Sequence, residues 1–215
     1  ERWMGLIRLL ISDPAAFVML AVLLLYSVIF HELAHGWVAC RMGDETAKWL
    51  GRLTLNPLKH LDPIGSLMLL VIGFGWAKPV PVNPANLRNG RRSMAVVAIA
   101  GPLTNLAIAG VLGFGFRFTG LLDAQFVDYV LVTTIWLNCA LLFFTLIPIP
   151  PLDGYRVLLG LLPEGAAIQY SRIGQVGPLA LVGLMMLGQF IPGVDILGTI
   201  VVQPTEALMR ALIGA

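Results

Sequence analysis

Two histidines and a glutamate stand inside an otherwise apolar stretch, in the order His31-Glu32-Leu33-Ala34-His35. On a helix, His31 and His35 lie one turn apart and differ by about 40° around the axis, so both imidazoles can reach one metal ion. Glu32 projects about 100° away from His31, near enough to take a proton from a metal-bound water without being a ligand. This spacing indicates a zinc site with Glu32 as general base.

A short pattern of this kind also occurs by chance on solvated helices. Here the preceding residues, 15–29, carry no charge, so no solvated face is available. Ionisable groups at the end of such a run are costly in lipid and are functional by default. We therefore interpret the motif as a metal site that lacks a third ligand.

Asp153 is the candidate for that ligand. It follows a third long apolar stretch and a proline-rich turn, Pro148-Ile-Pro-Pro-Leu-Asp153-Gly154. If 14–42, 93–116 and 126–147 cross a membrane in turn, Asp153 returns to the same side as His31 and His35. Two histidines, one carboxylate and a water form a catalytic zinc set. The alternative is that Asp153 only caps the helix that follows it.

The composition places the whole chain in a membrane. Of its 215 residues, 58% are hydrophobic and 12% are charged, and the mean hydropathy is +0.85, whereas soluble domains are about a quarter charged. The first apolar run is too long for the core of a cleaved signal peptide and contains the motif itself. Cys40 and Cys139 offer no disulfide framework. Nothing resembles a nucleic-acid module or a phosphate loop.

We expect an all-α polytopic membrane protein that forms one unit over 1–215. It should have about four transmembrane helices, interfacial helices and a re-entrant or extended β-like segment. Asp13 and Pro14 predict a helix start, and Gly43 predicts its end. The expected elements are an interfacial helix 1–13, spans 14–42, 93–116, 126–147 and 174–190, a mixed connection 43–92 and an interfacial helix 194–215.

The mixed connection carries most of the positive charge, which makes it cytoplasmic by the positive-inside rule. We therefore expect a multi-pass protein of a prokaryotic cell membrane, with its active site toward the cytoplasm. Eight of the 14 Lys and Arg lie here or directly before it: Arg41, Lys48, Arg52, Lys59, Lys78, Arg88, Arg91 and Arg92.

Two features of this connection suggest how a substrate could bind. Residues 64–75 are apolar but too few to span, so they are re-entrant or buried. In 76–84, three prolines forbid a helix and favour an edge strand. Such an edge could receive an unwound substrate strand through Val80, Val82 and Asn83. A rigid loop that packs on the bundle is the alternative.

The second span contains a break, Gly101-Pro102-Leu-Thr104-Asn105. In lipid, the freed backbone groups and polar side chains need protein or an enclosed cavity around them. These residues should therefore face inward, near the metal. The alternative is a packing kink in which Asn105 bonds a neighbouring helix.

Taken together, three ordered motifs resemble the site-2 protease family of intramembrane zinc metalloproteases. They are His31-Glu32-x-x-His35, the Gly101 to Asn105 segment and Pro148-x-Pro-x-Leu-Asp153-Gly154, supported by Gly51 to Leu58 and Trp76 to Asn83. The match covers roughly residues 30–159 and is closest to the small members without PDZ or CBS domains. It implies one Zn²⁺ per chain held by His31, His35 and Asp153, Glu32 as general base, and cleavage of a transmembrane protein substrate within or beside its helix in the lipid bilayer.

One position departs from the family pattern. Members usually carry an asparagine eight residues before the liganding aspartate, and this chain has Thr145 there. Asn138 is not at the matching position. Thr145 and Asn105 are the candidates for contacting the substrate or its developing oxyanion.

Two other functions are open at this stage. A metal-binding scaffold without activity would explain Thr145, although the retained Glu32 argues against it. A metal or proton transporter would need inverted repeats or carboxylates along a path, and the spans carry neither.

Overall fold

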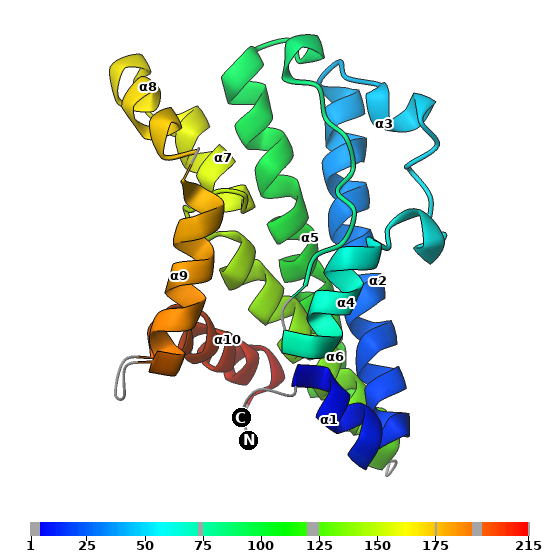
Figure 1. Ribbon diagram of the computed structural model, residues 1–215. Helices are drawn as coiled ribbons and strands as arrows, with labels where there is room; N and C mark the ends of the chain where they lie inside the picture. Colours follow the sequence, from blue (N-terminus) through cyan, green and yellow to red (C-terminus); the bar gives the residue numbers. More distant parts are fainter. Residues whose placement is uncertain (1–4, 73–74, 120–124, 175, 191–194, 215) are drawn as a thin grey trace.

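The structure is a computed structural model that describes residues 5–72, 75–119, 125–174, 176–190 and 195–214. Within these residues every regular element is a helix and no strand occurs (Figure 1). The expected all-α fold is therefore confirmed. The expected β-like segment is not a strand: residues 75–83 are irregular and join no sheet ladder.

Three helices are long and apolar enough to cross a membrane among the described residues. They are α2 (Pro14–Arg41), α5 (Gly90–Thr119) and α6 (Gln125–Thr145), with mean hydropathies of 2.1, 2.0 and 1.8 over their best windows. Even α6, with 21 residues, extends about 32 Å, which matches the hydrocarbon core of a bilayer. The chain is thus a polytopic membrane protein.

Helix α2 begins and ends where its sequence signals predict. The Asp13 side chain accepts a hydrogen bond of 3.0 Å from the backbone N–H of Ala16, and Pro14 is the first helical residue. After Met42 caps the other end, Gly43 has a φ of +110°, which a residue without Cβ adopts readily. These ends fix the stretch that carries His31 and His35.

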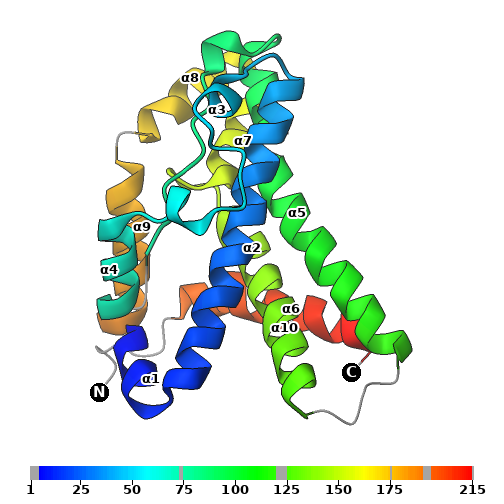
Figure 2. The same ribbon diagram turned by 90° about the vertical axis from the view of Figure 1, so that its right-hand side faces the viewer.

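Helix α5 is the centre of the bundle. It packs against α2, α6, α7 (Asp153–Leu161) and α10 (Gln203–Ile213) (Figure 2). It continues without a break through Pro102, which is buried, so the expected interruption of the helix at Gly101-Pro102 is wrong. Helices α2, α6 and α7, which carry candidate site residues, therefore all pack against α5.

The expected fourth span is shorter than a span. Helix α9 (Gly177–Phe190) has 14 residues and extends about 21 Å, less than the roughly 30 Å core of a bilayer. The length and composition of the described helices therefore support three spans rather than about four. Helix α8 (Glu164–Ile173) connects α7 to this part of the chain.

The C-terminal helix packs on the bundle. Residues 194 and 215 of the expected interfacial segment lie outside the described residues; between them, the π-helical turn η4 (Gly198–Val202) leads into α10. A core cluster joins α10 to α5 and α6: Ala109, Ile135 and Cys139 are fully buried, and they contact Leu208, Met209, Leu212 and Ile213.

Short helices make up the connection between α2 and α5. They are α3 (Thr46–Trp49), η2 (Pro57–Lys59), α4 (Pro63–Ile72) and η3 (Pro84–Asn86). Helix α4, with 10 residues, extends about 15 Å, so it does not span, as expected; positions 73 and 74 lie outside the described residues. It contacts α1 (Gly5–Ser12).

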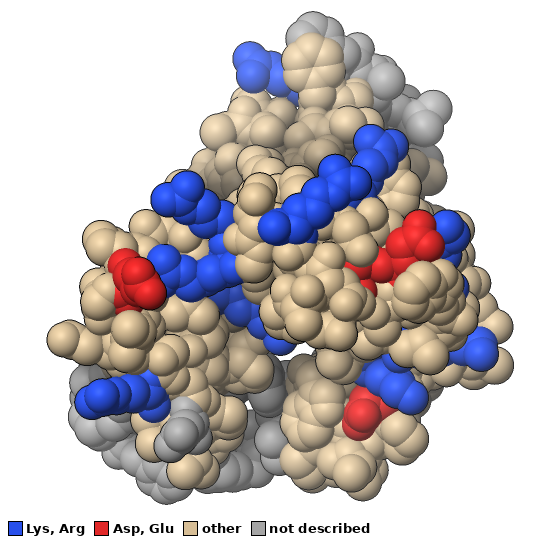
Figure 3. Space-filling view, turned by 90° about the horizontal axis from the view of Figure 1, so that it is seen from above, with Lys and Arg blue, Asp and Glu red and all other residues tan. Residues whose placement is uncertain are grey.

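Basic side chains gather at one end of the molecule. The view from above shows Lys and Arg spread over the face where α2 ends and α5 begins (Figure 3). Arg41, Lys48, Arg88 and Arg92 are exposed there. Arg41 also stacks over the Trp37 ring at 4.1 Å, an arrangement suited to a membrane–water interface.

Candidate metal centre

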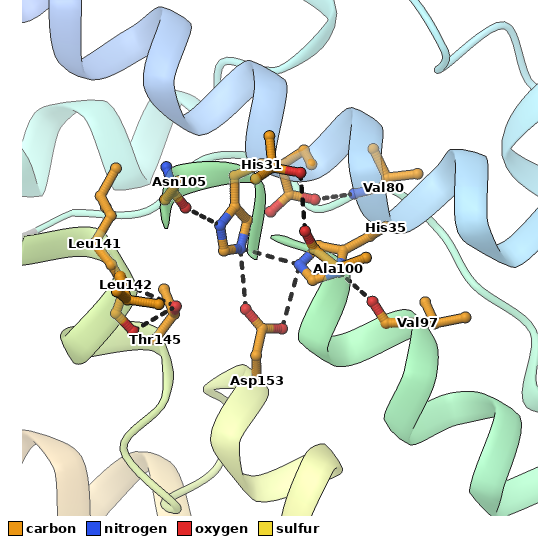
Figure 4. A network of polar contacts seen from close by, with 12 residues as sticks. His31, His35, Val80, Val97, Ala100, Asn105, Leu141, Leu142, Thr145 and Asp153 are labelled. Carbon is orange, nitrogen blue, oxygen red and sulfur yellow. Dashed lines mark hydrogen bonds and ion pairs between the residues drawn. The ribbon is translucent and has the colours of Figure 1, made fainter. Parts of the chain in front are cut away.

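Three potential ligands meet between α2 and the start of α7. His31 Nε2 lies 3.0 Å from His35 Nε2 and 3.0 Å from Asp153 Oδ2, and His35 Nε2 lies 3.4 Å from Asp153 Oδ1 (Figure 4). Ligand atoms around a tetrahedral zinc with bonds of 2.0–2.1 Å stand about 3.3 Å apart. The three side chains thus have the spacing that one zinc ion requires.

The surroundings of these atoms favour a bound cation. His31 and His35 are only 6% and 8% exposed, and the side chain of Asp153 is 13% exposed. Lone pairs and a carboxylate held this close, away from water, need positive charge between them. Among the described residues, this is the only such cluster of His, Cys, Asp and Glu.

The second nitrogen of each imidazole is occupied. His35 Nδ1 lies 2.8 Å from the backbone carbonyl oxygen of Val97, which can only accept, so Nδ1 carries the proton and the Nε2 lone pair is left for a metal. His31 Nδ1 lies 2.5 Å from Asn105 Oδ1. Both contacts come from α5 and orient the rings, as partners of metal-binding histidines generally do.

Gly101 explains how α5 comes so close to the histidines. An added Cβ at this position would lie 2.5 Å from Nε2 of both His31 and His35, far inside van der Waals contact. Pro102, the next residue, has no N–H for the carbonyl of Ala98 one turn earlier. The Gly-Pro pair lies about one turn after Val97, the residue whose carbonyl binds His35, and leaves α5 uninterrupted.

Asp153 does not act as a helix cap. It is the first residue of α7, the cap position belongs to Leu152, and no side-chain cap bond forms there. An added Cβ on Gly154 would collide with the carbonyl of Leu146. The turn before α7 therefore packs against the end of α6 and directs Asp153 toward the histidines.

Glu32 shares a cavity with the three potential ligands. The cavity has a volume of about 560 Å³, and apolar side chains such as Leu24, Val28 and Leu69 line most of it. Glu32 Oε2 accepts a hydrogen bond of 2.8 Å from the backbone N–H of Val80. A carboxylate held at the wall of an apolar cavity beside a metal site can take and return a proton.

The predicted strand residues differ in where they lie. Val80 and Val82 line the cavity, whereas Asn83 donates its N–H to Asp44 Oδ2 at 2.6 Å and caps η3 with its side chain. The N–H groups of Lys78 and Val80 are also used, by the His60 carbonyl and by Glu32. The edge of this segment is therefore partly occupied by its own protein.

Thr145 and Asn105, the two oxyanion candidates, lie differently as well. Thr145 lines the cavity, but its hydroxyl donates to the carbonyl of Leu141 at 2.8 Å. Asn105 is fully buried, and its side chain contacts His31 on one side and Asn138 on the other. A contact between Asn105 and substrate would require these bonds to break.

The sequence analysis missed two groups at this site. The Val97 carbonyl cannot be found from a residue type, because it is backbone. Asn138 is fully buried and bonds Asn105 at 2.8 Å. An amide side chain inside an apolar span is itself a signal of a functional role. Asn138 was nevertheless not predicted, because it does not lie at the position where the family motif has its asparagine.

Known proteins similar to this chain are zinc metalloproteases by name. The chain is 40% identical over 184 residues to a Bacillus subtilis protein named "Putative zinc metalloprotease YwhC", covering 80% of this chain and 83% of that one. Rip2 of Mycobacterium tuberculosis, with the same description, is 34% identical over 69% of this chain and 59% of its own length. Zinc metalloprotease MJ0392 of Methanocaldococcus jannaschii is 32% identical over 72% of this chain and 38% of its own length.

No protein-family profile and no solved structure matches the chain. The similarity to YwhC, over most of both chains, nevertheless settles the family. It agrees with the resemblance in the motifs and with a candidate metal site among helices long and apolar enough to cross a membrane. The chain belongs to the family of zinc metalloproteases that these relatives represent, in agreement with the family expected from the sequence.

Proposed function

We propose that the chain is a site-2-type protease, in which His31, His35 and Asp153 hold one zinc ion and Glu32 is the general base. The observation that carries the proposal is the meeting of these four side chains in one cavity, with the two histidines and Glu32 on a membrane-spanning helix. A zinc ion held by these three residues would supply Lewis-acid chemistry and would lower the pKa of a water toward neutrality.

The chain's own residues then move the protons. Glu32 takes a proton from the attacking water and delivers it to the amine nitrogen as the peptide bond breaks. The Val80 N–H holds one oxygen of this carboxylate at 2.8 Å, which leaves the other oxygen for the water. The buried contacts of His31 and His35 keep their rings in place while this happens.

The proposed substrate is a transmembrane helix that unwinds locally, because a helix has no free backbone groups and its scissile bond is shielded. The apolar cavity wall suits side chains that leave a bilayer. In residues 78–81, Lys78 and Val80 use their N–H groups within the protein, and Pro79 and Pro81 have none. We propose that this segment binds substrate in extended form, so that alternate residues face opposite ways and the carbonyls of Pro79 and Pro81 accept from substrate N–H groups.

We also propose that the centre lies toward the cytoplasmic side of a cell membrane. The basic end of the molecule is formed by the C-terminal end of α2 and the start of α5 (Figure 3). Cytoplasmic loops carry such an excess of Lys and Arg. His31 and His35 lie in the part of α2 nearer to this end.

The test uses four forms of the full chain reconstituted in vesicles: wild type, Glu32→Gln, Asp153→Ala and the surface control Glu206→Gln, which changes an exposed residue of α10. Zinc is measured by mass spectrometry, and cleavage is measured with a model transmembrane substrate. Wild type and control should bind one zinc and cleave. Glu32→Gln should keep zinc without cleaving, and Asp153→Ala should lose zinc.

Two results would overturn the proposal. Zinc in wild type without cleavage by either wild type or Glu32→Gln indicates a non-hydrolytic metal protein. One zinc per chain in Asp153→Ala removes Asp153 from the ligand set.

A further inference from the structure

A chain of buried hydrogen bonds leads from His31 across three helices. Asn105 Oδ1 contacts His31 Nδ1, and Asn105 Nδ2 donates to Asn138 Oδ1 at 2.8 Å. Asn138 Nδ2 donates to the Thr134 carbonyl and to Ser27 Oγ, both at 2.9 Å. Asn105 and Asn138 are fully buried and Ser27 is 4% exposed, so water does not compete for these bonds.

The direction of this chain is fixed at its far end. The carbonyl of Thr134 can only accept, so the Asn138 atom facing it must be the amide nitrogen. The Asn138 oxygen then faces Asn105, so Asn105 must donate a hydrogen bond to it from its own amide nitrogen. This turns the Asn105 oxygen toward His31, which must donate from Nδ1.

The opposite orientation of Asn105 would disable the ligand. A flipped amide would place its NH₂ group against His31 Nδ1 and two oxygens against each other at Asn138. Nδ1 would then have to accept, and the ring proton would move to Nε2, the atom that faces His35 and Asp153. A protonated Nε2 cannot bind a metal.

We infer that Asn138 is a positioning residue for the metal centre: acting through Asn105, it fixes the tautomer in which His31 offers its Nε2 lone pair to zinc. The hydrogen bonds of the Asn138 side chain go to Asn105, Ser27 and Thr134 rather than to the potential ligands, and Asn138 is not among the residues that line the cavity. The inference rests on the proposed role of His31 as a ligand. Outer partners of this kind typically change metal affinity 10- to 100-fold.

A simpler role would be to hold α2, α5 and α6 together, as buried amides in membrane bundles do. The two roles predict different zinc affinities when Asn105→Asp is combined with the loss of Asn138. A carboxylate accepts from His31 with either oxygen, so it needs no neighbour to orient it. Asn105→Asp should therefore restore the tautomer without Asn138, whereas lost helix packing would not be restored.

The experiment measures zinc affinity by chelator competition for the full chain in detergent. The variants are Asn138→Leu, Asn138→Ala, Asn105→Asp and the double change Asn105→Asp/Asn138→Leu. The control is Cys139→Ala, at a fully buried neighbouring position on α6. Asn138→Leu keeps a similar side-chain volume for the case in which Asn138→Ala fails to fold.

We expect both Asn138 variants to bind zinc at least about 10-fold more weakly than wild type, and the double variant to return to within about threefold of wild type. In ¹⁵N-histidine spectra of the metal-free chain, the proton should move from Nδ1 toward Nε2 of His31 in both single Asn138 variants and stay on Nδ1 in the double variant. Cys139→Ala should match wild type in both measurements.

Wild-type affinity in Asn138→Leu overturns the inference, and so does a double variant as weak as Asn138→Leu alone. Either result leaves the proposed protease intact if wild type binds zinc and cleaves. Failure of the wild type to bind zinc would instead count against the proposed ligand set.

Discussion

The backbone N–H of Val80 holds the Glu32 carboxylate through a hydrogen bond of 2.8 Å, so an irregular segment 48 residues away in sequence positions the proposed general base. Val80→Pro removes this N–H and keeps a backbone that two neighbouring prolines already restrict. We expect zinc content to be unchanged and kcat for cleavage of a transmembrane substrate to fall about 10- to 100-fold, because the base is no longer oriented.

Two matched variants separate this bond from other effects at the segment. Val80→Ala keeps the N–H and removes the side chain, and Val82→Pro places a proline at a cavity-lining position whose N–H makes no hydrogen bond within the described residues. Both should retain most of the wild-type kcat. Equal losses in all three variants would mean that the segment acts through its shape alone.

Gly101 permits the close approach of α5 to both imidazoles, so the metal centre should be sensitive to any side chain added at this position. Gly101→Ala places a methyl group 2.5 Å from Nε2 of His31 and of His35, so either the ligands or α5 must shift. We expect zinc affinity to fall at least about 10-fold, since a displacement of about 1 Å at a preorganised site has such effects. Chelator competition measures the change.

The control is Gly110→Ala on the same helix, where an added Cβ meets nothing within 4 Å. It should leave zinc affinity unchanged and raise helix stability by about 0.5–1 kcal/mol. If Gly101→Ala binds zinc as tightly as Gly110→Ala, then α5 does not form one wall of the metal centre.

Asp44 links the end of α2 to the segment that follows Val80. It is fully buried and accepts hydrogen bonds from the Thr46 N–H at 3.1 Å, the Thr46 hydroxyl at 2.5 Å, the Asn83 N–H at 2.6 Å and Asn86 Nδ2 at 2.9 Å. Burial raises the pKa of Asp44, but these hydrogen bonds from Thr46, Asn86 and Asn83 outweigh it, so the pKa lies below its usual value. Its charged form therefore stabilises the fold.

A carboxyl with a lowered pKa in the folded state contributes stability above its unfolded pKa of about 3.9 and loses it as the pH falls through the folded value. Asp44→Asn should lower the free energy of unfolding by about 1–3 kcal/mol at pH 7, and the difference from wild type should shrink below about pH 4. Denaturant unfolding in detergent between pH 3 and 7 measures this. Glu45→Gln, which changes an exposed ion pair with Lys48, should show little effect; a gap for Asp44→Asn that is constant with pH would contradict the prediction.

The sequence predicted correctly those features for which the residue types and their spacing allow only one simple structural interpretation. His31, Glu32 and His35 share a helix by their spacing, and a membrane needs long apolar runs, so the helix α2 and the three spans could be predicted. The zinc cofactor also agrees with the names of the relatives. Asp153 required the added argument that the spans alternate in direction.

The features that the sequence did not predict depend on contacts between distant segments, which a local sequence pattern does not show. The proline-rich segment looked like an edge strand, but its N–H groups at Lys78, Val80 and Asn83 bond other parts of the chain, so it joins no sheet. The fourth span was predicted from an apolar stretch whose helix is too short. Asn138 was not predicted because its role depends on contacts with Asn105 on α5 and Ser27 on α2, and spacing along one helix does not show which helices lie beside it.

Thr145 stands where the family motif that this chain resembles usually has asparagine, and the structure shows which hydrogen bond its hydroxyl makes. Its hydroxyl donates to the Leu141 carbonyl within α6 at 2.8 Å while its side chain lines the cavity. Thr145→Val, which keeps the shape and removes the hydroxyl, should therefore change kcat by less than about threefold, because a hydroxyl already bonded to its own helix stabilises no oxyanion. Thr145→Asn supplies an amide that reaches further, and one added oxyanion donor can increase kcat by up to about 100-fold. Initial rates of cleavage with zinc content held equal decide between these roles: a loss of about 100-fold in Thr145→Val would show that the threonine hydroxyl rotates to serve the substrate.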